Sequence, residues 1–168
     1  MAQIYTLHRL NQLDQSAFTV VLGDIFEETP EIAAQAWFAR PFGTVADLHR
    51  AMVGVVRSLP LADQLTLIQA HPDLGSRAQM ATASVQEQKG AGLNQLSAED
   101  YQRLLSLNEA YQARFGFPFI IAVRNHTQAS IFAALEERLQ HSQEEEQARA
   151  LLEIFEIARF RLGDRITT

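Results

Sequence analysis

The sequence contains no cysteine and only one lysine, and each scarcity removes a class of chemistry. Without cysteine the chain has no disulfides, thiolate nucleophiles or cysteine-bound metal sites. Lys89 is the one lysine among 14 basic residues, so any Schiff-base reaction would depend on it alone. A solvated lysine on a helix is the simpler interpretation of this residue.

The chain also lacks a basic surplus and long apolar runs. Its net charge of -6 argues against a nucleic-acid partner, because proteins that track phosphates usually carry a basic face. No segment approaches the ~18 apolar residues needed to cross a membrane, so we expect no membrane partner. The first residues do not resemble a signal peptide, and Arg165–Thr168 is not a peroxisomal address. We therefore expect a cytoplasmic protein.

What the chain does have is apolar residues at helical spacing over most of its length. With 168 residues, 47% of them hydrophobic and 20% charged, it has the size and composition of one domain with a substantial core. We predict an all-α fold, a single compact multi-helix bundle domain over residues 1–168. Apolar periodicity, caps and prolines predict helices from Leu10 to about Phe26, Glu31 to Arg40, Thr44 to about Leu59, Pro60 to about His71, Ser84 to about Gly90, Ser97 to Phe115, Thr127 to Leu139, and Ser142 to Leu162.

His71 is the first candidate for chemistry. Pro72 disfavours helical geometry at the residue before it, which places His71 at the end of a helix. There the helix dipole favours the imidazolium form while burial opposes it. A histidine that titrates near neutrality is a natural general acid or base. The alternative is a histidine that ends its helix by binding a free carbonyl.

Three polar side chains downstream share one helical face. Ser84, Glu87 and Gln88 stand at positions i, i+3 and i+4. A hydroxyl, a carboxylate and an amide on one face can bind a polar planar ligand such as a ureide or hydantoin. Ser-x-x-Glu is also a capping box, which would engage Ser84 and Glu87 with backbone amides and leave Gln88 unexplained.

A second unusual passage follows Gly116. Residues 117–123 are apolar and β-branched, yet no other stretch of the chain reads as a strand that could pair with them. Buried backbone groups seldom stay unpaired, so a helix, water or a ligand must satisfy them. A ligand bound by backbone amides at 119–123 is one solution, and a buried helix start or a core connector is the other.

The remaining polar candidates interrupt apolar stripes. Arg161 continues the stripe of Ala150, Ile154 and Ile157, where a buried arginine needs an anionic partner. Guanidinium suits a ligand carboxylate because it binds both oxygens, but an internal pairing with Glu or Asp is the alternative. For Asn108 an internal helix–helix hydrogen bond is the simpler interpretation. Potential metal ligands show no metal-binding spacing, so we expect no metal; these are His71, Asp73, Glu87 and His126.

Taken in order, these motifs resemble the OHCU decarboxylase family, the 2-oxo-4-hydroxy-4-carboxy-5-ureidoimidazoline decarboxylases that make (S)-allantoin in urate degradation. The resemblance spans nearly the whole chain. It rests on His71-Pro-Asp-Leu-Gly, Ser84-x-x-Glu87-Gln88, Asn108-x-x-Tyr111-x-x-x-Phe115-Gly-Phe-Pro-Phe119-Ile, Arg138-Leu139, and the last helix with Ile157 and Arg161-Leu162.

The resemblance implies an all-helical domain, commonly a homodimer, that needs no cofactor and acts on a small molecule. It implies His71 as catalytic acid or base and Glu87 as the group that orients or tunes it. The implied substrate-binding residues are Pro72, Ser84, Val85, Gln86, Glu87, Gln88, Phe119, Ile120, Ile121, Ala122, Val123 and Arg161. Two other functions remain open: a helical ligand-binding or regulatory module without catalysis, and a metal-dependent amidohydrolase.

Overall fold

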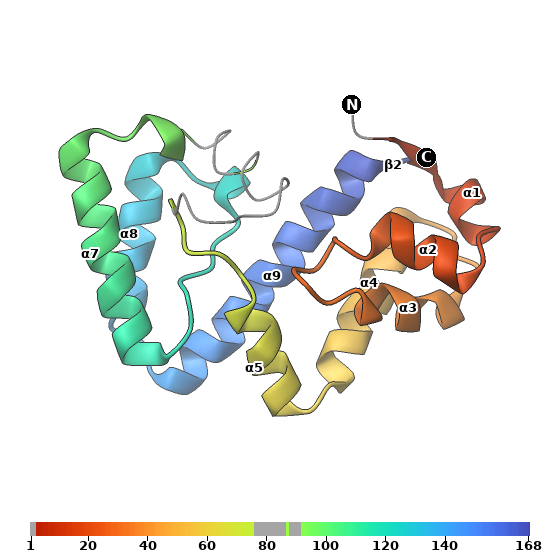
Figure 1. The fold of residues 1–168 in the computed structure, drawn as a ribbon, viewed down its shortest axis with the longest axis horizontal. Helices are drawn as coiled ribbons and strands as arrows, with labels where there is room; N and C mark the ends of the chain where they lie inside the picture. Colours follow the sequence, from red (N-terminus) through yellow and green to blue (C-terminus); the bar gives the residue numbers. More distant parts are fainter. Residues whose placement is uncertain (1–2, 76–86, 88–91) are drawn as a thin grey trace. The chain divides into compact units, whose positions relative to one another are not determined.

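The computed structural model describes residues 3–75, 87 and 92–168, and it is mostly helical (Figure 1). The all-α prediction is confirmed at that level. The chain forms two compact units, each described here by itself. The terminal unit comprises Met1–Leu67 and Phe155–Thr168, and the central unit comprises Ile68–Ile154. That residues 1–168 make a single domain stays a prediction.

The terminal unit contains a series of short helices followed by one longer helix. Helices α2, α3 and α4 pack in succession, and their apolar faces form a core to which each buried side chain contributes ~1.5–3 kcal/mol. The elements are β1 (Tyr5–Thr6), α1 (Leu7–Asn11), α2 (Gln15–Leu22), α3 (Glu31–Ala36), the 3-10 helix η1 (Trp37–Ala39), α4 (Val45–Ser58), most of α5 (Leu61–Gln69), the end of α9 (Gln143–Arg165) and β2 (Ile166–Thr167).

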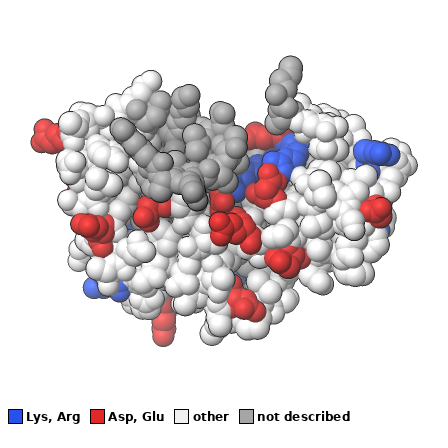
Figure 2. Space-filling model, viewed as in Figure 1, with Lys and Arg blue, Asp and Glu red and all other residues white. Residues whose placement is uncertain are grey.

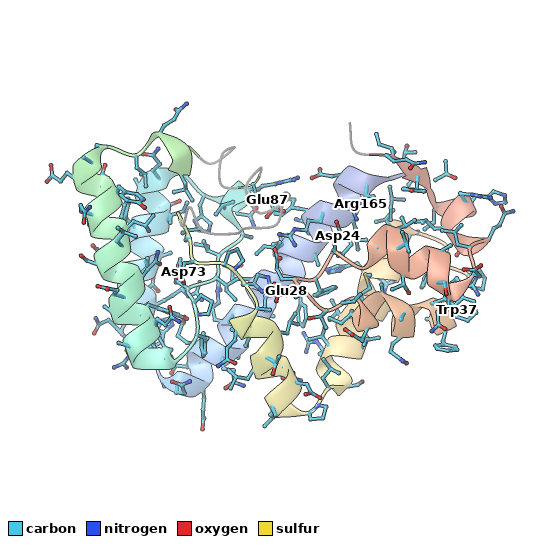
Figure 3. All side chains as sticks on the ribbon, viewed as in Figure 1. Asp24, Glu28, Trp37, Asp73, Glu87 and Arg165 are labelled. Carbon is cyan, nitrogen blue, oxygen red and sulfur yellow. The ribbon has the colours of Figure 1, made fainter. Side chains whose placement is uncertain are left out.

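The two ends of the terminal unit are joined by contacts that the sequence did not predict. Strands β1 and β2 pair in parallel, with Tyr5 opposite Ile166. Next to them, Arg165 donates to the Val21 carbonyl at 2.8 Å and pairs with Asp24 (Figure 3). The sequence indicated no strand candidate outside residues 117–123, and the pair β1–β2 shows that this was wrong. Two-residue strands are too short to show a periodic pattern.

The central unit is built on α7 (Ala98–Phe115) and α8 (Gln128–Arg138), which lie side by side (Figure 1). The first part of α9 completes it, together with the 3-10 helices η2 (Leu93–Gln95) and η3 (Val123–Asn125). An aromatic cluster lies at the end of α7, where the Tyr111 ring is 4.6 Å from Phe115, 5.9 Å from Phe117 and 5.3 Å from Phe119. Both units therefore have apolar interiors of their own.

Helix starts follow local side-chain caps, as predicted. Before α4, α7, α8 and α9, the hydroxyl of the preceding residue accepts a hydrogen bond from a backbone N–H in the first turn. This is confirmed for Thr44 before α4, Ser97 before α7, Thr127 before α8 and Ser142 before α9. Thr44 and Thr127 form complete capping boxes, with Asp47 and Ser130 respectively.

The predicted first helix, from Leu10 to Phe26, was wrong in its extent. Helix α1 already ends at Asn11, and α2 begins only at Gln15. Asp14 caps α2 by accepting from the Ala17 N–H at 2.8 Å. An aspartate that bonds the backbone in this way favours a helix start over a helix interior, which explains the break.

The surface and helix lengths add two observations. On the face shown in Figure 2, acidic side chains are scattered and much of the surface is uncharged, in keeping with the net charge of -6. Within the described ranges no single helix is long and apolar enough to cross a membrane. Helices α4 and α5, bent by 117° at their junction, pass that test of length and composition only when counted together.

Two glycines with the same backbone conformation provide a test of packing in the central unit. Gly75 and Gly116 have φ values of +74° and +79°. An added Cβ at Gly75 would lie 2.6 Å from Cδ2 of the buried Leu104, whereas nothing lies within 4 Å of one at Gly116. We expect Gly116→Ala to cost about 1–2 kcal/mol, the ordinary left-handed penalty. Gly75→Ala should cost about 1–3 kcal/mol more, because the core is overpacked.

Urea denaturation of both variants measures the difference. Equal losses of stability in the two variants would contradict the contact between Gly75 and Leu104.

Candidate functional site

His71 lies just after α5, as Pro72 led us to expect. Helix α5 ends at Gln69, and the His71 N–H donates to the Ile68 carbonyl at 3.3 Å. The His71 side chain is buried, with 8% of its surface exposed, and Pro72 is half-buried. Both residues belong to the central unit.

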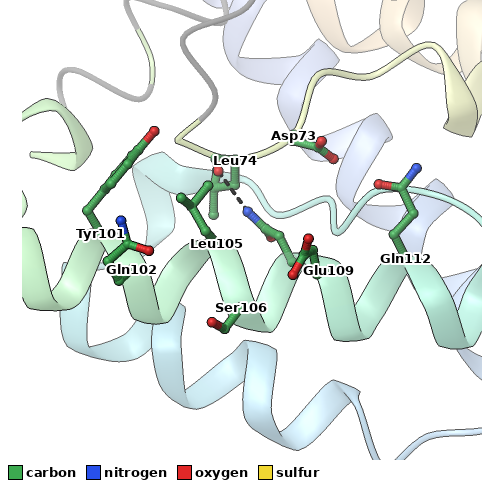
Figure 4. A pocket seen from close by; sticks show the side chains of 9 residues that line it. Asp73, Leu74, Tyr101, Gln102, Leu105, Ser106, Glu109 and Gln112 are labelled. Carbon is green, nitrogen blue, oxygen red and sulfur yellow. Dashed lines mark hydrogen bonds between the residues drawn. The ribbon is translucent and has the colours of Figure 1, made fainter.

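The passage that follows His71 is tied to α7 by Asn108. The Nδ2 of Asn108 donates to the Leu74 carbonyl at 2.8 Å (Figure 4). Asn108 is itself buried, and its Oδ1 has no hydrogen-bond partner among the residues that the structure describes. The expectation of an internal hydrogen bond for Asn108 is confirmed, although its partner is a loop carbonyl rather than another helix. This bond therefore holds the segment that carries His71 against α7.

A pocket of about 370 Å³ lies beside this anchor (Figure 4). Both polar and apolar atoms line it, and the lining residues come from α7 and the loop: Asp73, Leu74, Tyr101, Gln102, Leu105, Ser106, Asn108, Glu109 and Gln112. Partial burial in this wall raises the pKa of the Asp73 carboxyl above its ordinary value. None of the predicted site residues that the structure describes lines this pocket. Its first lining residue along the chain, Asp73, directly follows Pro72.

The predicted backbone-binding segment, residues 119–123, is buried and leads from the end of α7 into η3, whose first residue is Val123. Both alternatives describe part of it: residues 119–122 connect elements within the core, and the buried Val123 is the first residue of η3. Its attachment to α7 runs through Phe119, which packs edge-on against Tyr111. The loop after His71 and segment 119–123 are thus both held by α7.

A side chain satisfies part of this segment's backbone, which the sequence analysis did not foresee. Arg138, at the end of α8, donates from Nη1 to the Ile120 carbonyl at 2.6 Å. Its guanidinium also lies 4.4 Å from the centre of the Phe119 ring. Arg138 was noticed only as part of the resemblance. Its position three residues after Leu135 on the stripe of Ile131 and Leu135 would have marked it as a buried arginine.

Arg138 is neutralised by a fully buried glutamate. Its Nε donates to Glu146 Oε1 at 2.9 Å, and the Tyr111 hydroxyl donates to the same oxygen. The other oxygen, Oε2, lies 2.9 Å from Nδ1 of His141. Burial and the bond to Glu146 raise the pKa of Tyr111 well above its ordinary range, so its hydroxyl stays protonated and remains a donor. We call Tyr111, Arg138, His141 and Glu146 the Glu146 cluster.

Within the predicted face of residues 84–88, the structure describes one residue. Glu87 is helical and half-buried (Figure 3). Ser84, Val85, Gln86 and Gln88 lie outside the described residues, so their shared helical face stays a prediction.

Arg161 belongs to the terminal unit and is buried there. Its Nη2 donates to Glu27 Oε1 at 2.9 Å, and its Nη1 donates to the Ile25 carbonyl at 3.2 Å. Both side chains of the pair are nearly inaccessible, at 4% and 6% exposure. The internal pairing named as the alternative is therefore present. Arg159, by contrast, is exposed and pairs with Glu156 on its own helix.

The possible metal ligands do not gather in the described part of the chain. No three side chains of His, Asp or Glu lie close enough there to hold a metal ion.

Comparison with known proteins identifies the family of this chain. A sequence profile described as OHCU decarboxylase matches residues 11–163. This chain belongs to the OHCU decarboxylase family. The match includes α2 to α8 and most of α9, and therefore includes His71, segment 119–123 and Arg161.

Similar proteins in the family have different lengths. The uric acid degradation bifunctional protein PucL of Bacillus subtilis is 46% identical over 98% of this chain, but the match spans only 33% of PucL. The 2-oxo-4-hydroxy-4-carboxy-5-ureidoimidazoline decarboxylase of Haloferax volcanii is 42% identical, over 97% of both chains. The chain is thus similar to one part of the bifunctional protein PucL and to nearly the whole length of the Haloferax volcanii decarboxylase.

Two solved structures are also similar. The crystal structure of an (S)-allantoin synthase superposes with a TM-score of 0.78 at 31% identity, over 97% of this chain and 55% of that one. A second, of an OHCU decarboxylase in the presence of (S)-allantoin, has a TM-score of 0.68 at 24% identity over 90% and 97%. The second likeness shows the fold alone.

Asn108 allows a test of the anchor beneath the His71 loop. Asn108→Asp replaces the donor at the Leu74 carbonyl with a carboxylate oxygen, so we expect a loss of about 2–3 kcal/mol at pH 7. The repulsion raises the folded-state pKa of the introduced carboxyl above its unfolded value of ~3.9. The loss is therefore complete above the folded-state pKa and shrinks as the pH falls through it, because the protonated acid can donate.

Urea denaturation between pH 7 and pH 4 measures this dependence. Gln102→Glu is the matched control, because it adds the same charge on an exposed position of the same helix. If both variants showed the same stability at every pH, the anchoring role of Asn108 would be refuted.

Proposed function

We propose that this chain is an OHCU decarboxylase, which converts 2-oxo-4-hydroxy-4-carboxy-5-ureidoimidazoline to (S)-allantoin with release of CO₂ in urate degradation. The observation that carries the proposal is the family match over residues 11–163, supported by a relative of that name similar along 97% of both chains. The similarity to an (S)-allantoin synthase at 31% identity supports the product.

The reaction needs little covalent chemistry from the protein. The bond between the ring carbon and the carboxylate breaks, CO₂ leaves, and the electron pair is delocalised into the imidazoline ring. The ring nitrogen that receives the electron pair takes up one proton, a second proton is taken up on carbon, and the hydroxyl becomes a carbonyl as it loses its own proton. Because the ring accepts the electrons, no lysine or pyridoxal is needed. Enzymes lower barriers by ~8–23 kcal/mol, and here positioning and electrostatics must supply that reduction.

The proposed roles follow the residues that match the family. His71 acts as the acid or base, on the hydroxyl or as the donor of the stereospecific proton, and Glu87 orients or tunes it. The burial of His71 supports this role, because a buried imidazole is shielded from competing water. The residues proposed to hold the ureide, the ring or the carbonyl oxygens are Pro72, Ser84, Val85, Gln86, Gln88 and the backbone of Phe119, Ile120, Ile121, Ala122 and Val123.

We also propose Arg161 for the substrate carboxylate. Its burial supports this choice over Arg159, since a guanidinium shielded from water interacts more strongly with an anion. Arg161 also has Glu27 beside it, so a substrate carboxylate would share the guanidinium with that residue.

The wider proposal includes the properties that the family resemblance implies. The chain would act as a single domain over residues 1–168, as a cytoplasmic homodimer, on a small molecule and without a cofactor. The continuous family match and the equal length of the Haloferax volcanii relative support the single domain.

His71→Ala tests the catalytic role. We expect the rate of (S)-allantoin formation to fall by at least ~10²-fold, the smaller end of what general acid–base catalysis contributes. The measurement is circular dichroism of allantoin formed from freshly oxidised urate and its upstream hydrolase, compared with the spontaneous decay. His8→Ala, at an exposed position of α1, is the control and should keep the wild-type rate.

The rival functions give other results in the same assay. A folded His71→Ala variant that made (S)-allantoin at the wild-type rate would remove His71 from the mechanism. Wild-type protein that bound the product without accelerating its formation would identify a binding module. Activity lost to a chelator, with ring-opened product, would identify a metal-dependent amidohydrolase.

Arg161→Lys tests the carboxylate contact, with Arg159→Lys as the matched control on the same helix. Lysine keeps the charge but cannot bind both oxygens of a carboxylate, so we expect KM to rise about tenfold for Arg161→Lys and to stay unchanged for Arg159→Lys. Steady-state kinetics on both folded variants provides the measurement. Unchanged KM in both would exclude Arg161 as the carboxylate partner.

A further inference from the structure

Segment 119–123 is buried, and the Ile120 carbonyl within it accepts a hydrogen bond from a side chain rather than from another strand. Arg138 Nη1 donates to that carbonyl at 2.6 Å, while Arg138 Nε donates to Glu146 at 2.9 Å. The same guanidinium lies over the Phe119 ring. One arginine therefore contacts both the backbone and the side chains of this segment, and its own position is set by a fully buried carboxylate.

Stability alone does not account for this arrangement. Buried ion pairs contribute little net stability, because desolvation offsets their attraction, and apolar replacements are often neutral or stabilising. Within the described part of the chain, the buried Nη2 of Arg138 also has no hydrogen-bond partner, which adds a further penalty. The advantage of a guanidinium is its geometry. Its N–H donors lie in one plane at fixed angles, so they fix the positions of the atoms that they bind.

The fixed carbonyl determines where the next N–H points. The Ile120–Ile121 peptide is trans, and in a planar trans peptide the C=O of one residue and the N–H of the next point in opposite directions. Because Arg138 holds the Ile120 oxygen, the Ile121 N–H is directed to the far side of the segment. A charged donor on the carbonyl also polarises the peptide and makes its N–H a stronger donor.

We propose that Arg138 is a positioning residue, which the Glu146 cluster holds in place so that it directs the Ile121 N–H toward an oxygen of the bound substrate. Tyr111 contributes by donating to Glu146 Oε1, and its ring packs edge-on against Phe119. This inference rests on the proposed function, in which backbone amides of residues 119–123 bind carbonyl oxygen.

Arg138→Lys is the decisive variant, and Arg103→Lys is its matched control. Lysine keeps the charge beside Glu146 but cannot also donate to the Ile120 carbonyl in the geometry of the fork. Arg103 lies in the same unit and has two partners of the same kinds, a glutamate and a phenylalanine. It pairs with Glu136 and lies 4.5 Å from the Phe132 ring, but its side chain is exposed. We expect kcat/KM to fall about tenfold or more in Arg138→Lys and to stay unchanged in Arg103→Lys.

A second measurement separates positioning from general loss of structure. The amide signals of ¹⁵N-isoleucine-labelled full-length protein are followed during titration with (S)-allantoin. We expect the Ile121 signal to shift in wild type and in Arg103→Lys, and to respond at least fivefold less in Arg138→Lys. The pH at which kcat/KM changes should be the same in all three proteins, because Arg138 acts through the backbone and not on His71.

The outcomes distinguish this inference from the function on which it rests. If neither Ile120 nor Ile121 responds in wild type, these two amides do not bind the ligand, and both the backbone-binding role and the positioning role fall, while the rate of (S)-allantoin formation by the wild type tests the proposed function separately. If Ile121 responds equally in wild type and Arg138→Lys with unchanged kcat/KM, only the positioning role falls. Should Arg138→Lys not fold, Tyr111→Phe decides: it keeps the ring but removes the donor to Glu146. A two- to fivefold loss of kcat/KM supports the role, and an unchanged value overturns it.

Discussion

The central unit depends on the burial of one carboxylate. Glu146 has no exposed surface, so each of its oxygens needs a donor, and it obtains them from three other parts of the chain. Tyr111 reaches it from α7, Arg138 from the end of α8, and His141 from the loop before α9. Because removing one partner of such a pair leaves an uncompensated buried charge, these elements are held in one arrangement. The bond from Arg138 to Ile120 extends that arrangement to the candidate substrate segment.

Buried charges also explain why α9 does not follow a simple amphipathic pattern. Its buried stripe of Ala150, Ile154 and Ile157 continues to Glu146 at one end and Arg161 at the other, and each of these two charges is paired within its own unit. Exposed pairs of the same type are worth only ~0–1 kcal/mol, since water screens them. The buried pairs therefore hold the elements that they join in place, because loss of one partner would leave a buried charge unpaired. The surface pairs do not have this effect.

The candidate site combines a reactive side chain with backbone groups that are held rigidly. The loop after His71 is fixed to α7 through Asn108 and Leu74, and the segment around Ile120 is fixed through Arg138. A decarboxylase without a cofactor must lower its barrier by orientation and electrostatics, which requires such rigidity. Membership in the OHCU decarboxylase family and this support of two separate segments are consistent with each other.

The sequence by itself determined most of the helix starts and the end of α5. Caps such as Thr44 and Thr127 act over three residues, and Pro72 acts on its neighbour, so these features can be read locally. It also indicated His71 as a candidate acid or base and residues 119–123 as a segment with unusual backbone. The family was indicated by resemblance to known motifs. Only the tertiary structure decided which groups satisfy the buried charges. Tyr111 and Glu146 are 35 residues apart, and Arg161 and Glu27 are 134 apart. Such pairings leave no periodic pattern, because they depend on packing rather than on spacing along the chain.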